Sequence, residues 1–478
     1  MIGGIIVPMR VALVVAALIF AGCTERNPAF CGDGTCIDPA RPYCDLDGHI
    51  GGTPGTCIAV ECTPESFFEC RSDSAIVCNS LGNNYDEVQC PLGCTSDSMG
   101  CKECTSNDQC GDSVCDPLSS HCRACATDDE CDSAVCDRDT GRCVAESSIV
   151  YAAPMASGNC TRSQPCRLET AIVAARNATP TAIVRLLPGN YVNSLSVTGS
   201  TNLQFVATGA NIVVVGDTPA VVVDNGANVD IRNLTSTSER FIGCGLASTS
   251  APISTVSIRE STYTGIASGT ELETQRCKLT LTNVELFPSS TVVGYRDDST
   301  ITFDRVHVRG SDAHSFQGVG SRVNVEVVNS VFEGTDFTFL YTDPNGPATR
   351  IRFVHDTFLL SSPTHLCSNT GSPVPDFLIS FENSIAVTKF GGNAFAAPNT
   401  NNCSFAKLML AQQTSPLPGM EVADPQFVDL AGRDFRLKSS SPAIDAAVSG
   451  SINPTTDIIG VSRPQGPASD LGAYEFKP

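Results

Sequence analysis

One short pattern recurs seven times between Val229 and Ala386, and it constrains the fold more than any other feature of the chain. Each copy has two apolar residues that flank one outward residue, then a bend, then a return to apolar character. The apolar pairs are Val229/Ile231, Val256/Ile258, Leu279/Leu281, Ile301/Phe303, Val325/Val327, Ile351/Phe353 and Ile379/Phe381. Successive second members lie 27, 23, 22, 24, 26 and 28 residues apart, a spacing that marks solenoid repeats. Alternation with period two predicts a β-strand with one buried face in every repeat.

A column of bends is expected two residues after the second apolar residue of each pair. The bend positions are Asn233, Glu260, Asn283, Arg305, Asn329, His355 and Asn383. Asn tolerates a left-handed backbone and can bond its stacked equivalents. We therefore predict Asn-ladder turns at Asn233, Asn283, Asn329 and Asn383. A second inward strand is expected to follow each bend, at Leu234, Val284, Val306, Val331, Phe358 and Ile385.

This arrangement resembles the right-handed parallel β-helix of the pectin-lyase type, which implies an all-β fold. Apolar runs at 203–205, 212–215 and 220–223 supply further strands, so about ten rungs are expected, each ~4.8 Å thick. The register places Glu326 and Arg352 on adjacent rungs as an exposed ion pair, worth at most about 1 kcal/mol.

The N-terminus predicts export. Arg10 precedes an unbroken apolar run from Val11 to Phe20, which is too short to span a bilayer. The following Ala21-Gly22-Cys23 resembles the lipobox of bacterial lipoproteins, with Phe20 in place of the more usual Leu. That resemblance implies cleavage before Cys23, lipidation of Cys23, and attachment to a membrane of the bacterial cell envelope, at the outer membrane or cell surface. A plain secretory signal with an incidental cysteine is the alternative.

A cysteine-dense segment follows. Eighteen cysteines lie between Cys31 and Cys143 in a stretch poor in large apolar residues, so nine disulfides are expected to replace a core. A tandem repeat shifts four of these cysteines by 21 residues: Cys104, Cys110, Cys115 and Cys122 recur as Cys125, Cys131, Cys136 and Cys143. The repeat resembles the short Cys-rich repeats that follow the lipid anchor in many bacterial surface lipoproteins, where they act as stalks or contact modules.

Two metal alternatives arise in this segment. Cys101-x-x-Cys104 and Cys122-x-x-Cys125 fit a zinc-ribbon spacing, but an oxidising compartment and the internal repeat favour disulfides. The runs at 45–48 and 137–141 are fragments of calcium-loop chemistry without the distal Glu. Asx-turns are the preferred interpretation, so no metal or cofactor is assigned, although Ca²⁺ is kept as an alternative.

Four domains are expected: 1–22 as a lipoprotein signal peptide, 23–146 as disulfide repeats, 147–403 as the β-helix with its cap, and 404–478 as a terminal module. Pro165 and the apolar spacing after it predict a short amphipathic helix in the N-terminal cap. Remaining disulfide candidates are Cys160, Cys166, Cys244, Cys277, Cys367 and Cys403. Cys160 and Cys166 are expected to staple the cap loop. The spacing of the other four suggests that Cys244 pairs with Cys277 and Cys367 with Cys403.

The C-terminal stretch resembles the choice-of-anchor Q module of bacterial parallel β-helix proteins. The matching motifs run Asp424-Pro-Gln-Phe, Asp434-Phe-Arg-Leu, Ser441-Pro-Ala-Ile-Asp, Asp457-Ile-Ile-Gly, Arg463-Pro and Asp470-Leu-Gly-Ala-Tyr-Glu. We expect this module to close the last coil and cover its edge. Its acidic residues are interpreted as turn formers, not as catalysts.

The function is only partly constrained. The net charge of -21 makes nucleic acid an unlikely partner. The window 296–314 is the richest in titratable groups, and it supplies Asp304, His307 and Asp312 as catalytic candidates. The chain has no Trp and only eight Tyr, whereas sugar clefts stack rings on exposed aromatics. We expect a lipid-anchored, non-catalytic surface, adhesion or binding scaffold whose further partners are a polysaccharide or another surface protein. The alternative is an anchored polysaccharide lyase or glycoside hydrolase.

Overall fold

The computed structural model describes residues 29–478 apart from 32–33, 49, 51–52, 72, 96–99, 179–181, 267–268, 290, 311–315, 319–321, 336–348, 365–366, 368–376, 397, 399–402 and 451. The chain divides into two compact units, Met1–Val144 and Ala145–Pro478. The predicted lipidation site Cys23 and the catalytic candidate Asp312 lie outside the described residues.

The first unit is held by disulfides. It contains an antiparallel pair, β1 (Tyr43–Asp45) and β2 (Thr56–Ile58), and a three-stranded antiparallel sheet of β3 (Phe67–Arg71), β4 (Ser74–Cys78) and β5 (Tyr85–Gln89). The nine bonds join Cys31–Cys44, Cys36–Cys57, Cys62–Cys78, Cys70–Cys94, Cys90–Cys101, Cys104–Cys115, Cys110–Cys122, Cys125–Cys136 and Cys131–Cys143. The unit is therefore the disulfide-rich region predicted from the cysteine density.

The tandem repeat forms two equivalent modules. Each has a 3-10 turn, η1 (Asn107–Gln109) or η2 (Asp128–Glu130), followed by a two-stranded ladder. The ladders are β6 (Val114–Cys115) with β7 (Cys122–Arg123), and β8 (Cys136–Asp137) with β9 (Arg142–Cys143). The Oδ1 atoms of Asn107 and Asp128 accept equivalent bonds, each of 2.9 Å, from the backbone N–H of Cys115 and Cys136.

The disulfides leave no free thiolate for the zinc-ribbon alternative at its four cysteines. Cys101, Cys104, Cys122 and Cys125 are each bonded to another cysteine, which removes the thiolates that a zinc ribbon requires. The Oδ1 of Asp137 accepts from the Asp139 N–H at 3.1 Å, and its Oδ2 accepts from the Thr140 hydroxyl at 2.9 Å. These bonds form the Asx-turn expected there.

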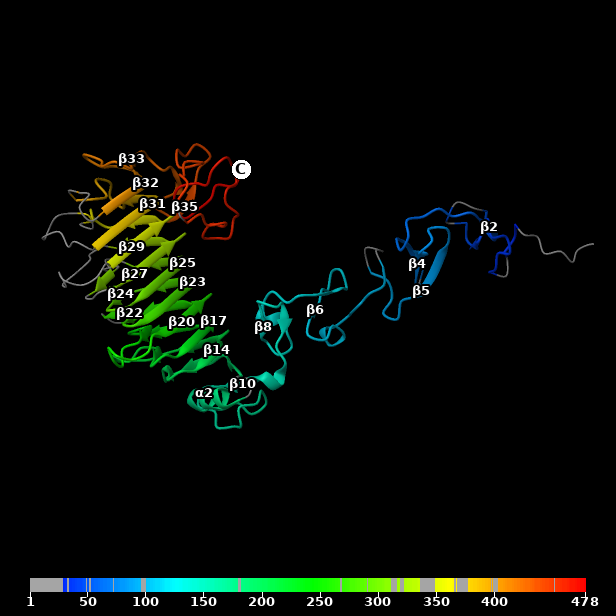
Figure 1. The fold of residues 1–478 in the computed structure, drawn as a ribbon, viewed down its shortest axis with the longest axis horizontal. Coiled ribbons are helices and arrows are strands. Elements are labelled where there is room, and N and C mark those ends of the chain that lie inside the picture. The colour runs from blue at the N-terminus through cyan, green and yellow to red at the C-terminus, as the bar shows by residue number, and fades with distance from the viewer. Residues whose placement is uncertain are drawn as a thin grey trace, which may run out of the picture. The chain divides into compact units, whose positions relative to one another are not determined.

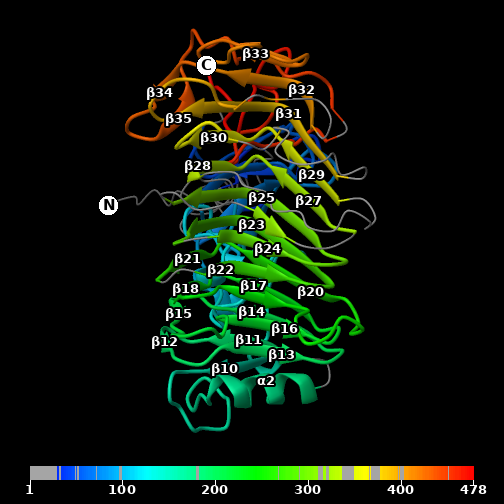
Figure 2. The same ribbon diagram turned by 90° about the vertical axis from the view of Figure 1, so that its left-hand side faces the viewer.

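The second unit is a parallel β-solenoid whose first face stacks ten strands (Figures 1 and 2). These strands are β11 (Ile183–Leu186), β14 (Asn202–Val206), β17 (Asn228–Arg232), β20 (Ser254–Arg259), β23 (Cys277–Phe287), β25 (Thr300–Arg309), β27 (Asn324–Val328), β29 (Thr349–Val354), β31 (Phe377–Thr388) and β32 (Cys403–Leu410). Ile231 pairs with Ile258, Ile258 with Leu281, and the column continues in register to Phe381. All fourteen predicted inward residues are buried, which confirms the repeat.

Two further faces complete each turn. The second face comes from β12 (Gly189–Tyr191), β15 (Ala210–Ile212), β18 (Thr235–Ser238), β21 (Thr262–Gly265), β28 (Val331–Thr335), β30 (Thr357–Leu360), β33 (Met420–Val422) and the later halves of β23, β25, β31 and β32. The third is a separate sheet of β13 (Leu195–Thr198), β16 (Val221–Asp224), β19 (Ile242–Cys244), β22 (Thr270–Thr274), β24 (Thr291–Tyr295) and β26 (Phe316–Gly318). Ten rungs were expected and ten strands stack on the first face, and six of these turns carry all three strands within the described residues.

The bend column lies where the sequence predicted it. All seven bend residues have φ between 50° and 59°, in the left-handed region that Asn tolerates. The amides do not form one ladder, because another residue type separates successive Asn. Instead, Asn233 donates to the Thr208 hydroxyl at 3.2 Å, Asn329 to the Thr456 carbonyl at 2.7 Å, and Asn383 to His355 Nε2 at 3.3 Å.

A capped end precedes the first turn. Helix α2 (Leu168–Asn177) turns Leu168, Ala171, Ile172 and Ala175 onto the core. The Cys160–Cys166 disulfide closes a loop that lies along the free edge of β10 (Ile149–Ala152). There the Tyr151 N–H donates a hydrogen bond to the Cys160 carbonyl at 2.9 Å. The disulfides Cys244–Cys277 and Cys367–Cys403 join neighbouring turns, and these are the pairs that the spacing suggested.

The C-terminal stretch lies along the flank of the solenoid. Parallel pairing continues past residue 403 through β32 and β33, after which β34 (Phe427–Asp429) and β35 (Asp434–Leu437) form a hairpin. A second apolar core joins this stretch to the last turns through Val331, Leu359, Ile385, Val387, Met409, Phe427, Phe435, Leu437, Ala443, Leu471 and Ala473. This apolar core therefore packs against the side of the last turns. In this respect the expectation that the stretch closes the last coil is wrong.

The register explains this position. Val331 and Ile385, expected to point inward, stack instead in the outward column that contains Glu285 and His307 in earlier turns. In the last turns this outward column is apolar apart from Thr357, so it needs a cover that the earlier, polar positions do not need.

Candidate functional site

His307 lies on the outward side of the second half of β25, largely buried between charged neighbours. Its Nδ1 atom is 3.3 Å from Nε and 3.2 Å from Nη2 of Arg309. A guanidinium can only donate, so Nδ1 must accept and the ring proton sits on Nε2. Nε2–H then donates to Oε1 of Glu333, with which it is in contact.

The carboxylate of Glu333 is only 2% exposed and is surrounded by donors. Arg309 Nε lies 3.7 Å from Oε1, and Arg433 Nη1 lies 3.1 Å from Oε2. Arg309 also approaches Glu285 at 3.5 Å and stands over the Phe287 ring at 5.9 Å. Because Arg433 comes from the C-terminal stretch, the cluster joins that stretch to the solenoid.

This geometry limits what His307 can do chemically. A general base needs a free nitrogen within hydrogen-bond reach of its substrate. Here the unprotonated nitrogen faces the Arg309 guanidinium and the other nitrogen faces Glu333, so neither is free to take a proton from a substrate. The arrangement is that of an ion cluster that joins two elements.

Asp304 does not join His307. It precedes the bend at Arg305, in the part of β25 that pairs with the first face, whereas His307 lies on the second face. Its Oδ2 is 3.2 Å from Arg305 Nη2. The two candidates therefore lie on different faces of the solenoid.

Other charged groups in the window are also paired. Arg296 lies 2.8 Å from Glu273. Asp298 contacts Arg322 and lies 2.8 Å from Arg276, and the hydrogen bond from Arg322 is the main reason that its pKa is lowered. The predicted pair of Glu326 and Arg352 is present in register at 4.0 Å, although Arg352 bonds more closely to Glu382, at 2.7 Å.

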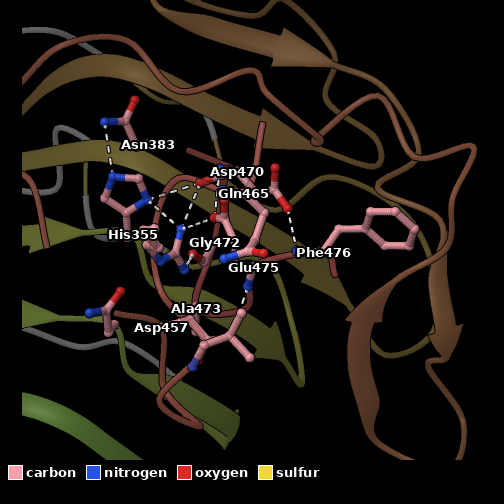
Figure 3. Close-up of polar contacts among 12 residues, drawn as sticks. His355, Asn383, Asp457, Gln465, Asp470, Gly472, Ala473, Glu475 and Phe476 are labelled. Carbon is pink, nitrogen blue, oxygen red and sulfur yellow. Dashed lines mark hydrogen bonds and ion pairs between the residues drawn. The ribbon is translucent and has the colours of Figure 1, made fainter. Parts of the chain in front are cut away.

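A larger buried polar cluster lies where the bend column meets the C-terminal stretch (Figure 3). The Asn383 amide donates to the Val448 carbonyl and accepts from the Val448 N–H, both at 2.9 Å. The same amide nitrogen lies 3.3 Å from His355 Nε2, while His355 Nδ1 lies 3.0 Å from the Asp470 carbonyl. A neutral His355 with its proton on Nδ1 satisfies these two contacts, and Arg463 Nη1, which lies 3.1 Å from the same Nδ1, then donates to the Asp470 carbonyl instead. Burial lowers the pKa of His355 to about 3, which is consistent with that neutral form.

A buried ion pair completes this cluster. The side chains of Arg463 and Glu475 are 0% and 1% exposed and lie 3.2 Å apart. Arg463 also donates to the Asp470 carbonyl at 3.0 Å and the Gly472 carbonyl at 2.8 Å. Asp470 accepts backbone N–H groups from Asp445 and Phe476, and burial raises its pKa to about 6.

The acidic residues of the C-terminal motifs thus mainly organise turns, in keeping with the turn-forming role expected for them. Asp457 accepts from the N–H groups of Ile459, Val461 and Glu475. Sequence reasoning identified these motifs but did not connect them with His355 and Asn383, which it treated only as bend formers. The sequence does contain a signal for this contact. The outward column that includes His307 changes from polar to mainly apolar residues in the later turns, which indicates that another segment packs there.

A hollow of about 240 Å³ lies beside α2. It is lined by 153–155, 167–169 and 190–193, so none of the predicted catalytic candidates faces it. In the part of the chain that the structure describes, no helix is both long and apolar enough to cross a membrane.

Comparisons with known proteins find a distant structural likeness. No protein-family model and no curated protein matches the chain. Among solved structures, pectate lyase Pel9A superposes on 69% of this chain and 96% of its own, with a TM-score of 0.42 and 14% sequence identity. The chain is a parallel β-solenoid, preceded by a disulfide-rich region, with a distant structural similarity to that pectate lyase.

Proposed function

We propose that this protein is a lipid-anchored component of a bacterial cell envelope, in which the solenoid is a non-catalytic surface, adhesion or binding scaffold. The observation that carries the proposal is a cysteine count. The chain has 25 cysteines, and 24 of them form the twelve disulfides. The remaining one is Cys23, at the lipobox-like sequence.

An odd cysteine in an otherwise fully paired exported chain calls for a separate chemical role. Acylation of the Cys23 thiol and of the new amino terminus would supply that role. Several acyl chains anchor durably, at ~0.8 kcal/mol per buried CH₂, whereas one chain binds only reversibly. The twelve disulfides support an oxidising compartment, which a location in the cell envelope would provide.

The ion pairs of the 296–309 window support the non-catalytic part of the proposal. Arg296, Asp298, Asp304, Arg305, His307 and Arg309 each contact a group of opposite or complementary charge. A glycosidase would need two carboxyls that face a shared bond. In this window Asp298 and Asp304 instead contact guanidinium groups.

Anchoring is tested by expressing the full chain and its Cys23→Ser variant in a bacterium fed a clickable fatty acid. We expect the label and the membrane-bound fraction only with Cys23, and a soluble, unlabelled exported product with Cys23→Ser. Equal labelling of both chains, or a soluble unlabelled parent chain, would favour the plain secretory signal instead.

Catalysis is tested with the disulfide-intact protein on a panel of uronate and neutral glycans. We expect neither unsaturated nor reducing ends above the level released by a heat-denatured sample. Release that disappears in His307→Gln, but persists in the Arg322→Gln control, would establish the anchored polysaccharide lyase or glycoside hydrolase instead.

A further inference from the structure

Three aromatic rings meet on the surface of the disulfide-rich unit. Tyr43 comes from β1, Phe68 from β3 and Tyr85 from β5. The ring centroid of Tyr85 lies 5.4 Å from that of Tyr43 and 5.0 Å from that of Phe68. We call these three residues the aromatic platform.

The platform differs from the other aromatic clusters of this protein by its exposure. Phe68 is 42% exposed and the two tyrosines are half-buried. The ten largest fully buried side chains are all aromatic, and all lie in the second unit. A break in register between Phe67 and Glu69 marks a β-bulge at Phe68, and bulges re-aim the side chains that they contain.

The stretch of chain that carries the platform is strongly acidic. Residues 29–101 contain eleven acidic and two basic residues. Side chains alternate along a strand, so Glu87 shares the face of β5 that carries Tyr85. Glu69 and Glu87 are the partners of Ile76 on either side of the central strand β4, which places them two strand spacings, roughly 10 Å, apart.

We propose that the aromatic platform binds an Arg- or Lys-rich segment of another polypeptide. The electron-rich faces of Phe and Tyr attract guanidinium and ammonium groups, and the surrounding carboxylates add a long-range attraction. A neutral sugar would use the rings but not the charge, and a second copy of this chain would bring more negative charge to a region that is already acidic. The proposal concerns the first unit and stands whether or not the solenoid acts as a scaffold.

The test uses the full chain with Cys23→Ser, which is also the parent of all variants, and a short fluorescent oligo-arginine peptide at ~0.1 M salt. Binding is measured by anisotropy. We expect Phe68→Leu and Tyr85→Leu each to weaken binding about two- to five-fold, the range for an exposed cation–π contact. Tyr85→Phe keeps the ring and should bind like the parent. Native mass spectrometry, which counts the disulfides, confirms that each variant is folded.

Two controls separate a site from general charge attraction. Leu118→Ala removes another exposed apolar side chain of the same unit, and Asp139→Asn removes an exposed charge outside the platform. Glu87→Gln should weaken binding more than Asp139→Asn does. Equal effects of these two substitutions, with no effect of Phe68→Leu, would overturn the proposal. Platform-dependent binding of a neutral oligosaccharide, or platform-dependent dimerisation in place of peptide binding, would overturn it as well.

Discussion

The contact between Asn383 and Val448 gives the sharpest test of how the C-terminal stretch is held. Asn383→Gly removes three hydrogen bonds, two to the Val448 backbone and one to His355. The backbone of residue 383 has φ of 50°, a conformation that glycine adopts without strain. The substitution therefore removes the contact without forcing the bend to change.

The magnitude follows from burial. Asn383 is fully buried, so the loss leaves a backbone N–H and a C=O of Val448 without their side-chain partners. At about 0.5–1.5 kcal/mol for each net bond, and more for a buried group left unsatisfied, we expect a loss of roughly 2–4 kcal/mol. Asn283→Gly is the matched control. It makes the same exchange at φ of 53° in the same bend column, where the side chain is exposed, and should change stability by less than about 1 kcal/mol.

Hydrogen exchange measured by mass spectrometry localises the effect. In Asn383→Gly, amides between 443 and 476 should exchange roughly 30- to 1,000-fold faster, because 1.4 kcal/mol is a factor of ten in local opening. Amides of β17 and β20 should be unchanged, since solenoid turns interact mainly with their neighbours. Protection of 443–476 that survives the substitution, or an equal loss in Asn283→Gly, would refute the assigned role of this contact.

Three further predictions concern the core, the pH response and the disulfides. Phe353→Ala, within the buried stack of phenylalanines, should lower the free energy of unfolding by about 3–5 kcal/mol in guanidinium titrations. Phe390→Ala, 82% exposed, should change it by less than about 0.5 kcal/mol. Burial lowers the pKa of His355 from 6.5 to about 3, so the unfolded chain takes up a proton first and stability falls as the pH drops below about 6.5. His355→Asn should reduce that slope by roughly 1 kcal/mol per pH unit between pH 6 and 4, whereas Asp470, whose raised pKa gives the opposite slope, contributes equally to both proteins. An identical slope in both proteins would contradict a neutral buried His355. Non-reducing peptide mapping should find the same pairing in both tandem repeats, offset by 21 residues; any bond between the repeats would disprove their equivalence.

The strand columns were predictable because they depend on local periodicity. In a strand that lines a dry interior, every second residue must be apolar in every turn, so each inward position can be identified from the sequence. The left-handed bends were predictable for a related reason, because Asn at four of the seven positions marks a backbone that few residues accept. Glu260, Arg305 and His355 were then placed by spacing alone.

The candidate site was less predictable because it depends on contacts between distant segments. The sequence did not indicate Glu333 as a site residue, although its carboxylate contacts both His307 and Arg433. A shift of one residue in the second inward strand was enough to turn Val331 and Ile385 from core residues into outward ones. That same shift hid the apolar flank on which the C-terminal stretch packs.

The two ends of the solenoid have a consequence for solubility. An uncovered ladder of backbone N–H and C=O groups can recruit another chain and seed fibres. Here the loop closed by Cys160 and Cys166 occupies one end, and at the other β33 spans only three residues, with Pro418 before it and Pro425 after it. So short a strand between prolines is a poor template for an incoming strand. Concentrated preparations should thus remain free of thioflavin-positive filaments for as long as the Cys160–Cys166 bridge stays oxidised.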